Sequence, residues 1–325
     1  MRIVVTGSAG HLGEGLARSL RGAGHKVVGL DLLASPWTDV VGSVTDRPVV
    51  REVVAGADAV LHAATLHKPH VISHTKQDFV DTNVTGTLNV LEEAVAAGVS
   101  RVVFTSSTTT FGRTLVPPPG APAAWITEGA VPAVKNVYGA TKVAAEELCE
   151  LVHREHGLAV LVLRTARFFP EADDRSDVRE RYDDTNLKVN ELLYRRADLE
   201  DVVAAHVLAL EKAPEVGFDR LVISATTPFT PEDLTQLRVD APAVVARRVP
   251  GYEEVYAQRG WRMLDAIERV YVNGRAREVL GWAPRFDFAH AIDRLRVGQP
   301  WGSELARRVG AKGYRAESAG VIGRR

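Results

Sequence analysis

A tyrosine and a lysine four positions apart, Tyr138 and Lys142, begin a segment whose apolar residues recur with helical spacing. That spacing places both side chains on one face of a helix. A free phenol has a pKa of about 10, so it is a poor base at neutral pH unless a neighbouring cation favours its ionised form. The pair therefore predicts a proton-transfer site in which Lys142 lowers the pKa of Tyr138. An ordinary surface helix can carry the same pair, so the prediction needs a hydride acceptor and a partner hydroxyl elsewhere.

A glycine-rich turn follows the first predicted strand. The β-branched run 2–6 predicts a buried parallel strand, and a helical stripe begins after Gly13. Glycines between them allow a tight turn and a close approach of the backbone to a pyrophosphate. The free N–H groups at the start of the helix attract an anion. The predicted cofactor contacts in this turn are Gly7, Gly10, His11, Leu12 and Gly13.

The second predicted strand, 26–30, ends in Asp31. A carboxylate at that strand end hydrogen-bonds the two ribose hydroxyls of NAD and repels the additional phosphate of NADP. Leu32 and Leu33 follow, with no arginine nearby to bind that phosphate. The sequence therefore predicts NAD as the cofactor.

Strand and helix patterns keep alternating through the first half of the chain. The predicted strands are 2–6, 26–30, 59–62, 102–105 and 160–163, and the predicted helices after the first are 48–55, 79–97 and 138–156. This alternation predicts an α/β fold, a Rossmann-type doubly wound parallel sheet, with ligands beyond the carboxyl ends of the strands.

The later part of the chain predicts a smaller region that interleaves with the sheet, through a helix at 199–210 and a strand at 221–224. We expect three parts: an NAD-binding Rossmann domain at 1–164, a C-terminal substrate-binding region at 165–300 and a C-terminal tail at 301–325. The tail is rich in glycine and arginine, and either frays or folds over the site.

Further motifs appear in a fixed order after the glycine turn. They are Asp46 after Gly-Ser-Val-Thr, His62-Ala63-Ala64, Asn83-x-x-Gly86-Thr87, Ser106-Ser107 and Tyr138-x-x-x-Lys142. Together they resemble the motifs of the extended short-chain dehydrogenases/reductases, in the branch of nucleotide-sugar epimerases and dehydratases. The resemblance is specific over the first 165 residues and looser beyond them, where 196–203 and 275–284 carry it.

This resemblance implies roles for several residues. It implies that Asp46 meets the adenine ring, that the turn of His62, Ala63 and Ala64 lines the nicotinamide ribose, and that Asn83 fixes a neighbouring helix or a water. Lys142 would bind the ribose as well as tune the phenol. A homodimer is also implied, with an interface built by the helices near 83–97 and 138–156.

The same resemblance makes Ser107 the catalytic hydroxyl beside Tyr138, with Ser106 and Thr108 as alternatives one residue away. Dehydratases of the family carry an Asp-Glu pair after this hydroxyl, whereas this chain continues with threonines at 108–110. Dehydration is therefore not expected. Two outcomes stay open: an epimerase that retains NAD, or a dehydrogenase that releases a ketone and NADH. A sensor that binds NAD without turnover is disfavoured, because such proteins tend to lose the tyrosine or the lysine.

The predicted substrate contacts depart from the family pattern. Family members usually carry an asparagine and a Gly-Pro-type turn after the strand that ends here at Arg164, but this chain has Thr165-Ala166-Arg167. An arginine can bind a phosphate or a carboxylate with two hydrogen bonds. We therefore predict substrate contacts from Thr108, Arg167 and Arg275, and a substrate that is a sugar, a sugar nucleotide or another anionic alcohol.

Three histidines, His67, His70 and His74, would share one face of a helix, an arrangement that zinc can use. No carboxylate or cysteine completes the set in this segment. The histidines therefore predict a pocket wall or an exposed surface rather than a metal site.

The composition of the chain limits the class of binding partner. With 46% hydrophobic residues among 325, a net charge of -1 and a pI near 6.8, the chain favours a small-molecule partner over nucleic acid or a membrane surface. No stretch approaches the ~18 apolar residues of a membrane span, and no signal peptide begins the sequence. We expect a cytoplasmic protein.

Overall fold

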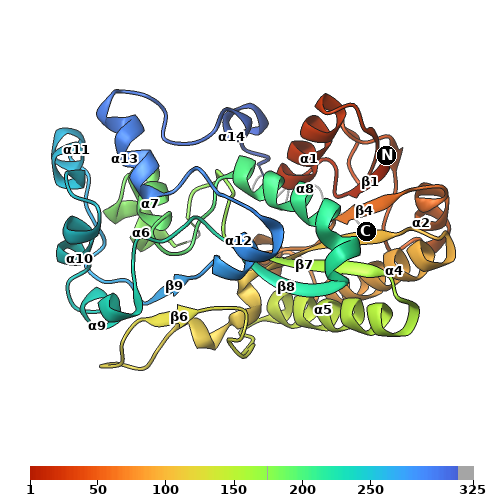
Figure 1. Cartoon of the computed structure of the whole chain (residues 1–325), viewed down its shortest axis with the longest axis horizontal. Coiled ribbons are helices and arrows are strands. Elements are labelled where there is room, and N and C mark those ends of the chain that lie inside the picture. Colours follow the sequence, from red (N-terminus) through yellow and green to blue (C-terminus); the bar gives the residue numbers. More distant parts are fainter. Residues whose placement is uncertain (174, 314–325) are drawn as a thin grey trace.

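The computed structural model describes residues 1–173 and 175–313. Its centre is a seven-stranded sheet in the order β3-β2-β1-β4-β5-β7-β8, in which every neighbouring pair is parallel. The strands are β1 (Arg2–Thr6), β2 (Lys26–Asp31), β3 (Val40–Val41), β4 (Ala59–His62), β5 (Arg101–Ser107), β7 (Ala159–Thr165) and β8 (Phe218–Ile223). Their carboxyl ends face the side of the sheet where the second region of the molecule lies (Figure 1).

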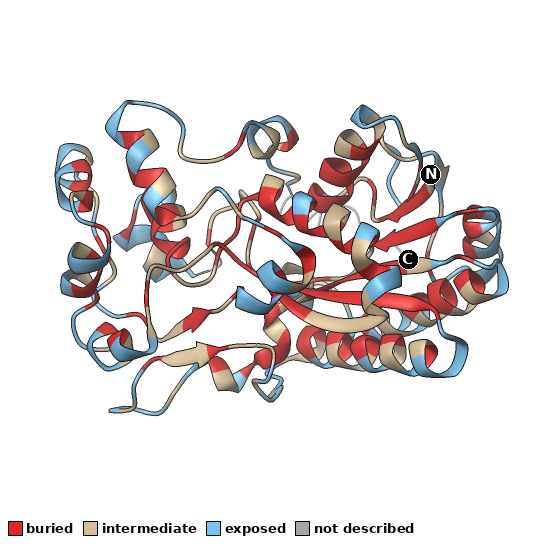
Figure 2. Cartoon of the chain, in the orientation of Figure 1, coloured by how far each residue is buried: buried red, intermediate tan, exposed pale blue. Residues whose placement is uncertain are grey.

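Helices cover both faces of this sheet. One face carries α1 (His11–Gly22) and α8 (Leu199–Val216), and the other carries α2 (Arg47–Val54), α4 (Gly86–Ala96) and α5 (Val137–His156). A separate apolar core fills each space between helices and sheet, and Figure 2 shows the strands and inner helix faces buried. The doubly wound Rossmann fold predicted from the alternating pattern is confirmed.

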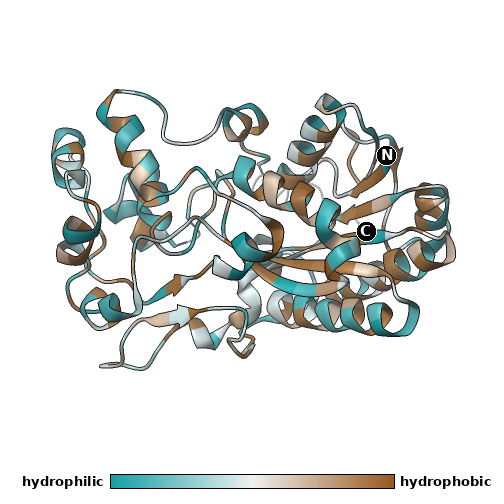
Figure 3. Cartoon of the chain, in the orientation of Figure 1, coloured by the Kyte–Doolittle hydropathy of each residue, from teal (hydrophilic) through white to brown (hydrophobic). Residues whose placement is uncertain are grey.

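The second region has its own apolar core, which lies away from the sheet. It contains the parallel pair β6 (Ala124–Ile126) and β9 (Arg269–Tyr271), and the helices α6 (Ser176–Arg181), α7 (Asp184–Glu191), α9 (Leu234–Leu237), α10 (Ala241–Arg248), α11 (Tyr252–Arg259) and α13 (Phe288–Arg296). Figure 3 shows that these helices are amphipathic, with apolar residues on some faces and polar residues on others. Because β6 precedes residue 164, this region is assembled from both sides of the predicted domain boundary.

The region between 76 and 97 differs from the single predicted helix at 79–97. Three consecutive segments occupy it: α3 (Lys76–Val80), a π-helical turn at Asp81–Thr85 and α4. Such wide turns inside helices are frequent at functional sites. Here the turn contains Asn83, which is buried.

The start of the predicted tail folds against the sheet domain. Helix α14 (Glu304–Val309) packs on α1 and α8, and the backbone N–H of Ser303 donates to Asp198 Oδ2 at 2.9 Å. Helix α12 (Gly274–Leu280) packs on α8 and β8. The remainder of the tail, 314–325, lies outside the described residues. Within the part of the chain that is described, no helix has the length and apolar character needed to cross a membrane.

Candidate active site

The turn between β1 and α1 forms one wall of a cavity of about 510 Å³, within the ~300–1,000 Å³ of ordinary ligand clefts. Gly7 has a φ of 73°, and a Cβ on it would lie 2.7 Å from the backbone nitrogen of Ala64. A Cβ on Gly13 would lie 1.9 Å from the carbonyl oxygen of Gly7. Only glycine fits these two positions, so the turn stays narrow and the start of α1 faces the cavity with bare backbone. A dinucleotide pyrophosphate fits such a cradle.

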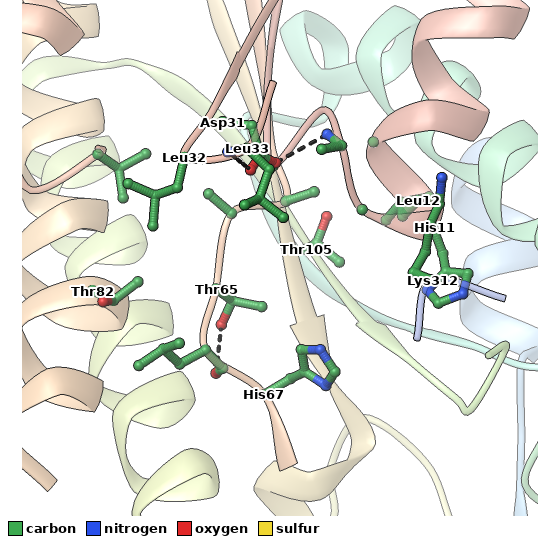
Figure 4. A pocket seen from close by; sticks show the side chains of 18 of the residues that line it. His11, Leu12, Asp31, Leu32, Leu33, Thr65, His67, Thr82, Thr105 and Lys312 are labelled. Carbon is green, nitrogen blue, oxygen red and sulfur yellow. Dashed lines mark hydrogen bonds between the residues drawn. The ribbon is translucent and has the colours of Figure 1, made fainter. Parts of the chain in front are cut away.

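Asp31 also lines this cavity, at the carboxyl end of β2 and next to the glycine turn (Figure 4). Its carboxylate accepts hydrogen bonds from the backbone N–H of Ala9 at 3.0 Å and of Leu33 at 2.9 Å. These bonds fix the carboxylate beside the glycine turn and leave acceptor capacity for ribose hydroxyls. Leu32 and Leu33 also line the cavity and are 65% and 50% exposed, and no arginine lies among the described lining residues. The cavity therefore fits NAD.

The remaining predicted cofactor residues divide into lining and supporting positions. Ala63 and Ala64 line the cavity, whereas the His62 side chain is buried behind them between Thr6 Oγ1 at 2.7 Å and Thr87 Oγ1 at 3.0 Å. Burial lowers the pKa of His62 to about 3, so its ring is neutral and structural. Asp46 lies outside the cavity wall and caps α2 by accepting from the N–H of Val49.

Asn83 holds two parts of the site together. Its carbonyl oxygen accepts from the backbone N–H of Leu66 at 2.8 Å, and its amide group donates to Thr141 Oγ1 at 3.0 Å. Leu66 belongs to the loop after β4, and Thr141 lies in α5 between Tyr138 and Lys142. The π-helical turn thus fixes α5 against a wall of the cavity, in agreement with the positioning role predicted for Asn83.

Tyr138 lies where the first cavity meets a second one. It lines the 510 Å³ cavity and also an adjoining cavity of about 300 Å³, which is bounded by Ser107, Thr108 and Thr165. The side chain is 7% exposed. A group that exchanges a proton with a substrate next to a bound nicotinamide needs this position between the two compartments.

Ser107 and its neighbour Ser106 have different partners. The Ser107 side chain lies beside the Tyr138 phenol and acts to lower its pKa, and its Oγ lies 3.0 Å from Thr109 Oγ1. Ser106 is buried and donates to Glu146 Oε1 at 2.5 Å. Of the two serines, Ser107 is thus the neighbour of the phenol, and its catalytic role stays a prediction.

Lys142 is buried beside the end of β5. Its Nζ donates to the carbonyl oxygen of Thr105 at 2.6 Å and lies 3.9 Å from the centre of the Phe104 ring, behind the cavity wall. Burial lowers the pKa of Lys142 to about 7. Burial likewise raises the pKa of Tyr138 to about 12, and the neighbouring Ser107 side chain opposes this only in part. Desolvation is therefore the largest influence on both groups, and the tuning of the phenol by Lys142 stays a prediction.

The second cavity is rich in cations. Lys68, Lys135, Arg167, Arg195 and Arg269 all line it, and Glu171 is the one carboxylate among its described lining residues. The guanidinium of Arg269 lies over the rings of Tyr194 and Tyr271. Tyr194 follows the C-terminal end of α7, and Tyr271 is the last residue of β9. Several charges of one sign in a concave wall favour a ligand of the opposite sign.

The three predicted substrate contacts have different locations. Thr108 lines the second cavity, and so does Arg167, whose Nη1 donates to Asp173 Oδ2 at 2.8 Å while Nη2 donates to the carbonyl of Glu171 at 3.1 Å. Arg275 lies away from both cavities, on α12, where its Nη2 is 2.8 Å from Asp219 Oδ2. The structure thus brings Thr108 and Arg167 to the site and leaves Arg275 in a surface ion pair.

The histidine segment forms part of the wall of the first cavity. The centres of the His67 and His70 rings are 4.4 Å apart, and those of His70 and His74 are 5.1 Å apart, around a short 3-10 helix at Lys68–Ile72. His67 also stacks on Phe169. Among the residues that the structure describes, no group of three or more His, Cys, Asp or Glu side chains could hold a metal ion.

Four basic residues that line the cavities were not singled out in the sequence: Lys68, Lys135, Arg195 and Lys312. All four are far along the chain from the glycine turn, and Lys135 alone is a near neighbour of Tyr138, three positions before it. Only the tertiary fold brings them to the site. The sequence signal that could have indicated them is an excess of basic residues in the loops after strands, which is weak.

The sheet, the glycine cradle and the serine-tyrosine pair between two cavities define a dinucleotide-binding α/β protein equipped for proton transfer. Residues 3–223 match the model of the NAD dependent epimerase/dehydratase family. The chain is 29% identical over 329 aligned residues to the UDP-glucose 4-epimerase of Streptomyces lividans, covering 90% of this chain and 94% of that protein. It is 26% identical over 350 residues to the 3-beta-hydroxysteroid dehydrogenase of Mycolicibacterium neoaurum, covering 90% and 89%.

A solved UDP-Glc/GlcNAc 4-epimerase from Campylobacter jejuni has the same fold, with a TM-score of 0.66 at 16% identity over 94% of this chain and 99% of that one. The chain belongs to the NAD dependent epimerase/dehydratase family, and NAD is its cofactor.

Proposed function

We propose that this protein is a sugar epimerase that inverts a secondary alcohol of a nucleotide-linked or otherwise anionic sugar through a transient ketone. The observation that carries the proposal is the position of Tyr138, which lines both cavities and has the Ser107 side chain beside its phenol. Bound NAD supplies a hydride acceptor that can return the hydride. The residues of the chain supply the rest of the chemistry.

Each of these residues has a distinct task at the substrate hydroxyl. Ser107 Oγ and Tyr138 Oη hold that hydroxyl, and Tyr138 Oη takes its proton as the alcohol is oxidised and returns it when the ketone is reduced. A positioned proton donor and acceptor of this kind contributes about 10²- to 10⁴-fold to a rate. Because burial raises the pKa of the phenol to about 12, bound cofactor and substrate must lower that pKa before the phenol can accept a proton. A cationic nicotinamide ring would act in this direction.

The carboxylates near the site support epimerisation over dehydration. Elimination of water needs an acid and a base beside the sugar carbon. Glu171 is the one carboxylate among the described residues of the second cavity, and it is engaged by His11 Nε2 at 3.1 Å and by the backbone N–H of Lys312 at 2.9 Å. The residues after Ser107 are threonines. No acid-base pair is therefore ready for elimination in the described wall.

The cations of the second cavity support an anionic substrate. Lys68, Lys135 and Arg269 come from three different segments and converge on one compartment. A sugar nucleotide carries its negative charge on a diphosphate, whereas a sugar acid carries it on the sugar itself. The relative from Streptomyces lividans is named as acting on UDP-glucose, which favours the nucleotide-linked substrate.

An NAD-dependent dehydrogenase or reductase of a free sugar, sugar acid or alicyclic alcohol is the second candidate. Arg167 favours it, because this arginine stands on the cavity wall where family members usually carry an asparagine. The relative from Mycolicibacterium neoaurum is named as a dehydrogenase. Its identity to this chain, 26%, is similar to the 29% of the epimerase from Streptomyces lividans. The same serine-tyrosine pair serves both reactions, which differ only in whether the ketone leaves.

We also propose a homodimer that pairs α4 and α5 with the same helices of a second copy. Leu151 on α5 is 39% exposed, which is consistent with an apolar surface available for pairing. Light scattering combined with gel filtration measures the assembly. A monomer at micromolar concentration contradicts this part of the proposal.

One assay separates the two candidate reactions. Protein loaded with NAD is incubated with UDP-hexoses, with hexuronic acids and with free sugars, while proton NMR follows inversion and absorbance follows reduced nicotinamide. The epimerase proposal expects an inverted sugar nucleotide without net reduced cofactor. Accumulation of reduced cofactor in step with a released ketone supports the dehydrogenase instead, and the absence of both overturns the proposal.

A further inference from the structure

The C-terminal strap, which we define as residues 310–313, reaches the cofactor cavity from outside the Rossmann motif. It follows α14, whose Leu305, Ala306 and Val309 pack into the same apolar core as α1. Because α14 is held against α1, the strap after it has a fixed point of departure. Lys312 in this strap is one of the residues that line the first cavity.

Glu171 and His11 hold the strap in place. The backbone N–H of Lys312 donates to Glu171 Oε1 at 2.9 Å, and the same carboxylate oxygen lies 3.1 Å from His11 Nε2. His11 is the first residue of α1, and Glu171 lies on the wall of the second cavity. Glu171 therefore connects the strap both to the start of α1 and to the wall of the second cavity.

The side chain of Lys312 forms an ion pair with Glu14 in the first turn of α1. Glu14 is 6% exposed and is also paired with Arg18 Nη2 at 2.7 Å. A carboxylate in the first turn occupies the region where the helix N-terminus attracts anions, so it opposes a phosphate there. Two cations around one carboxylate leave a local excess of one positive charge (+2 - 1 = +1).

Figure 4 shows Lys312 beside His11 and Leu12, at the α1 end of the cavity and away from Asp31. The glycine turn that fits a pyrophosphate runs from Ala9, whose N–H donates to Asp31, to His11 at the start of α1. Asp31 carries the chemistry suited to a ribose, and the start of α1 carries the chemistry suited to the phosphates. The ammonium group of Lys312 lies at the start of α1, where it pairs with Glu14.

We propose that Lys312 is a cofactor-binding residue, which contributes a positive charge to the diphosphate of NAD from the C-terminal strap. The ligand chemistry is a dinucleotide diphosphate. Lys312 has 21% of its side chain exposed, so its charge is partly screened by water. Loss of a charge-assisted contact of this kind corresponds to about a tenfold rise in the dissociation constant.

The test uses isothermal titration of the full-length protein after removal of bound NAD. Lys312→Gln is compared with wild type for NAD and for adenosine, which shares a nucleoside with NAD but has no phosphate. We expect the dissociation constant of NAD to rise about tenfold and that of adenosine to change less than twofold. Lys312→Arg should retain most of the NAD affinity, and added salt should weaken wild-type binding more than that of Lys312→Gln.

Arg308→Gln is the matched control, because Arg308 pairs with Glu304 on the exposed side of α14. We expect it to leave NAD binding unchanged. A Glu14→Gln background distinguishes direct contact from mere neutralisation of Glu14. If Lys312 faces the diphosphate, Lys312→Gln weakens NAD binding in this background too. Unchanged NAD affinity in Lys312→Gln, an equal loss for adenosine, or disappearance of the effect in the Glu14→Gln background each overturns the proposal.

Discussion

The first cavity is lined mainly by residues that follow parallel strands, whereas the second cavity is assembled from segments far apart in the chain. Gly7, Asp31 and Ala63 follow β1, β2 and β4 or end them, so the sheet alone places them together. Lys135 and Arg269 reach the second cavity through a loop and through β9. The comparison shows that cofactor chemistry follows from the fold, while substrate chemistry depends on how the second region packs.

The largest expected effect is at the junction of the two cavities. Tyr138→Phe removes the proton carrier but keeps the ring, so we expect turnover to fall about 10³-fold while NAD affinity stays within about twofold. Steady-state kinetics and titration of NAD measure the two quantities. Ser106→Ala provides a nearby comparison, because Ser106 faces Glu146 rather than the phenol. A Tyr138→Phe enzyme with wild-type turnover would contradict the assignment of Tyr138 as the proton carrier.

Asp31 tests the cofactor cavity alone. Asp31→Asn keeps the shape of the side chain but removes its charge, and we expect the dissociation constant of NAD to rise about tenfold to a hundredfold. Discrimination against NADP should shrink, because the repulsion of the additional phosphate is lost. Turnover with saturating NAD should remain close to wild type. Equal binding of NAD and NADP by the wild-type protein would contradict this role.

Glu171 joins the two cavities, and its effect depends on pH. Burial opposes its ionisation, but the hydrogen bond from His11 and that from the backbone of Lys312 hold the pKa of Glu171 at about 2, below the ordinary 4.5. A carboxyl whose pKa is depressed on folding stabilises the protein above pH 4.5, and this contribution is lost as pH falls toward 2.

We therefore expect Glu171→Gln to lower the free energy of unfolding by about 1–2 kcal/mol at pH 7, a magnitude reduced for partial exposure. The difference from wild type should shrink as pH falls below 4.5. Urea unfolding at several pH values measures it. A difference that stays constant or grows toward low pH would show that the ionised carboxylate of Glu171 is not its source.

The smallest expected effect concerns the arginines of the substrate half. Arg167→Gln should lower kcat/KM about threefold to tenfold, because Arg167 lines the second cavity but shares its charge with Asp173. Arg275→Gln is the paired control, since Arg275 lies in a surface pair with Asp219. We expect it to leave kcat/KM within about twofold. Equal losses from both variants would remove the distinction between cavity and surface.

The sequence predicted the cofactor half well, because its determinants are local. A strand, a glycine turn and a helix start, as at Thr6, Gly7 and His11, are encoded within a few residues. Pairing of strands then brings Asp31 beside the turn without further information. The family resemblance favoured Ser107 in the same segment, but it left Ser106 and Thr108 as alternatives one residue away.

The substrate half could not be predicted in the same way. In the sequence, Arg167 and Arg275 are equally good candidates for binding an anion. The tertiary structure distinguishes them, because Arg275 pairs with Asp219 on the surface whereas Arg167 lines the second cavity. The pKa of Tyr138 also depends on burial, which a spacing does not show. Lys312 lies 156 residues beyond the end of the helix that carries Tyr138 (312 - 156), so no local pattern connects them.

The account rests on a hydride that leaves one carbon of the substrate and returns to the same carbon. Epimerisation of a UDP-hexose in deuterium oxide, followed by mass spectrometry and proton NMR, tests this directly. The account predicts an inverted product whose carbon-bound hydrogen is the original protium, without accumulation of reduced cofactor. Deuterium at the inverted carbon would contradict it, because that result requires removal of a proton from carbon rather than oxidation of the alcohol.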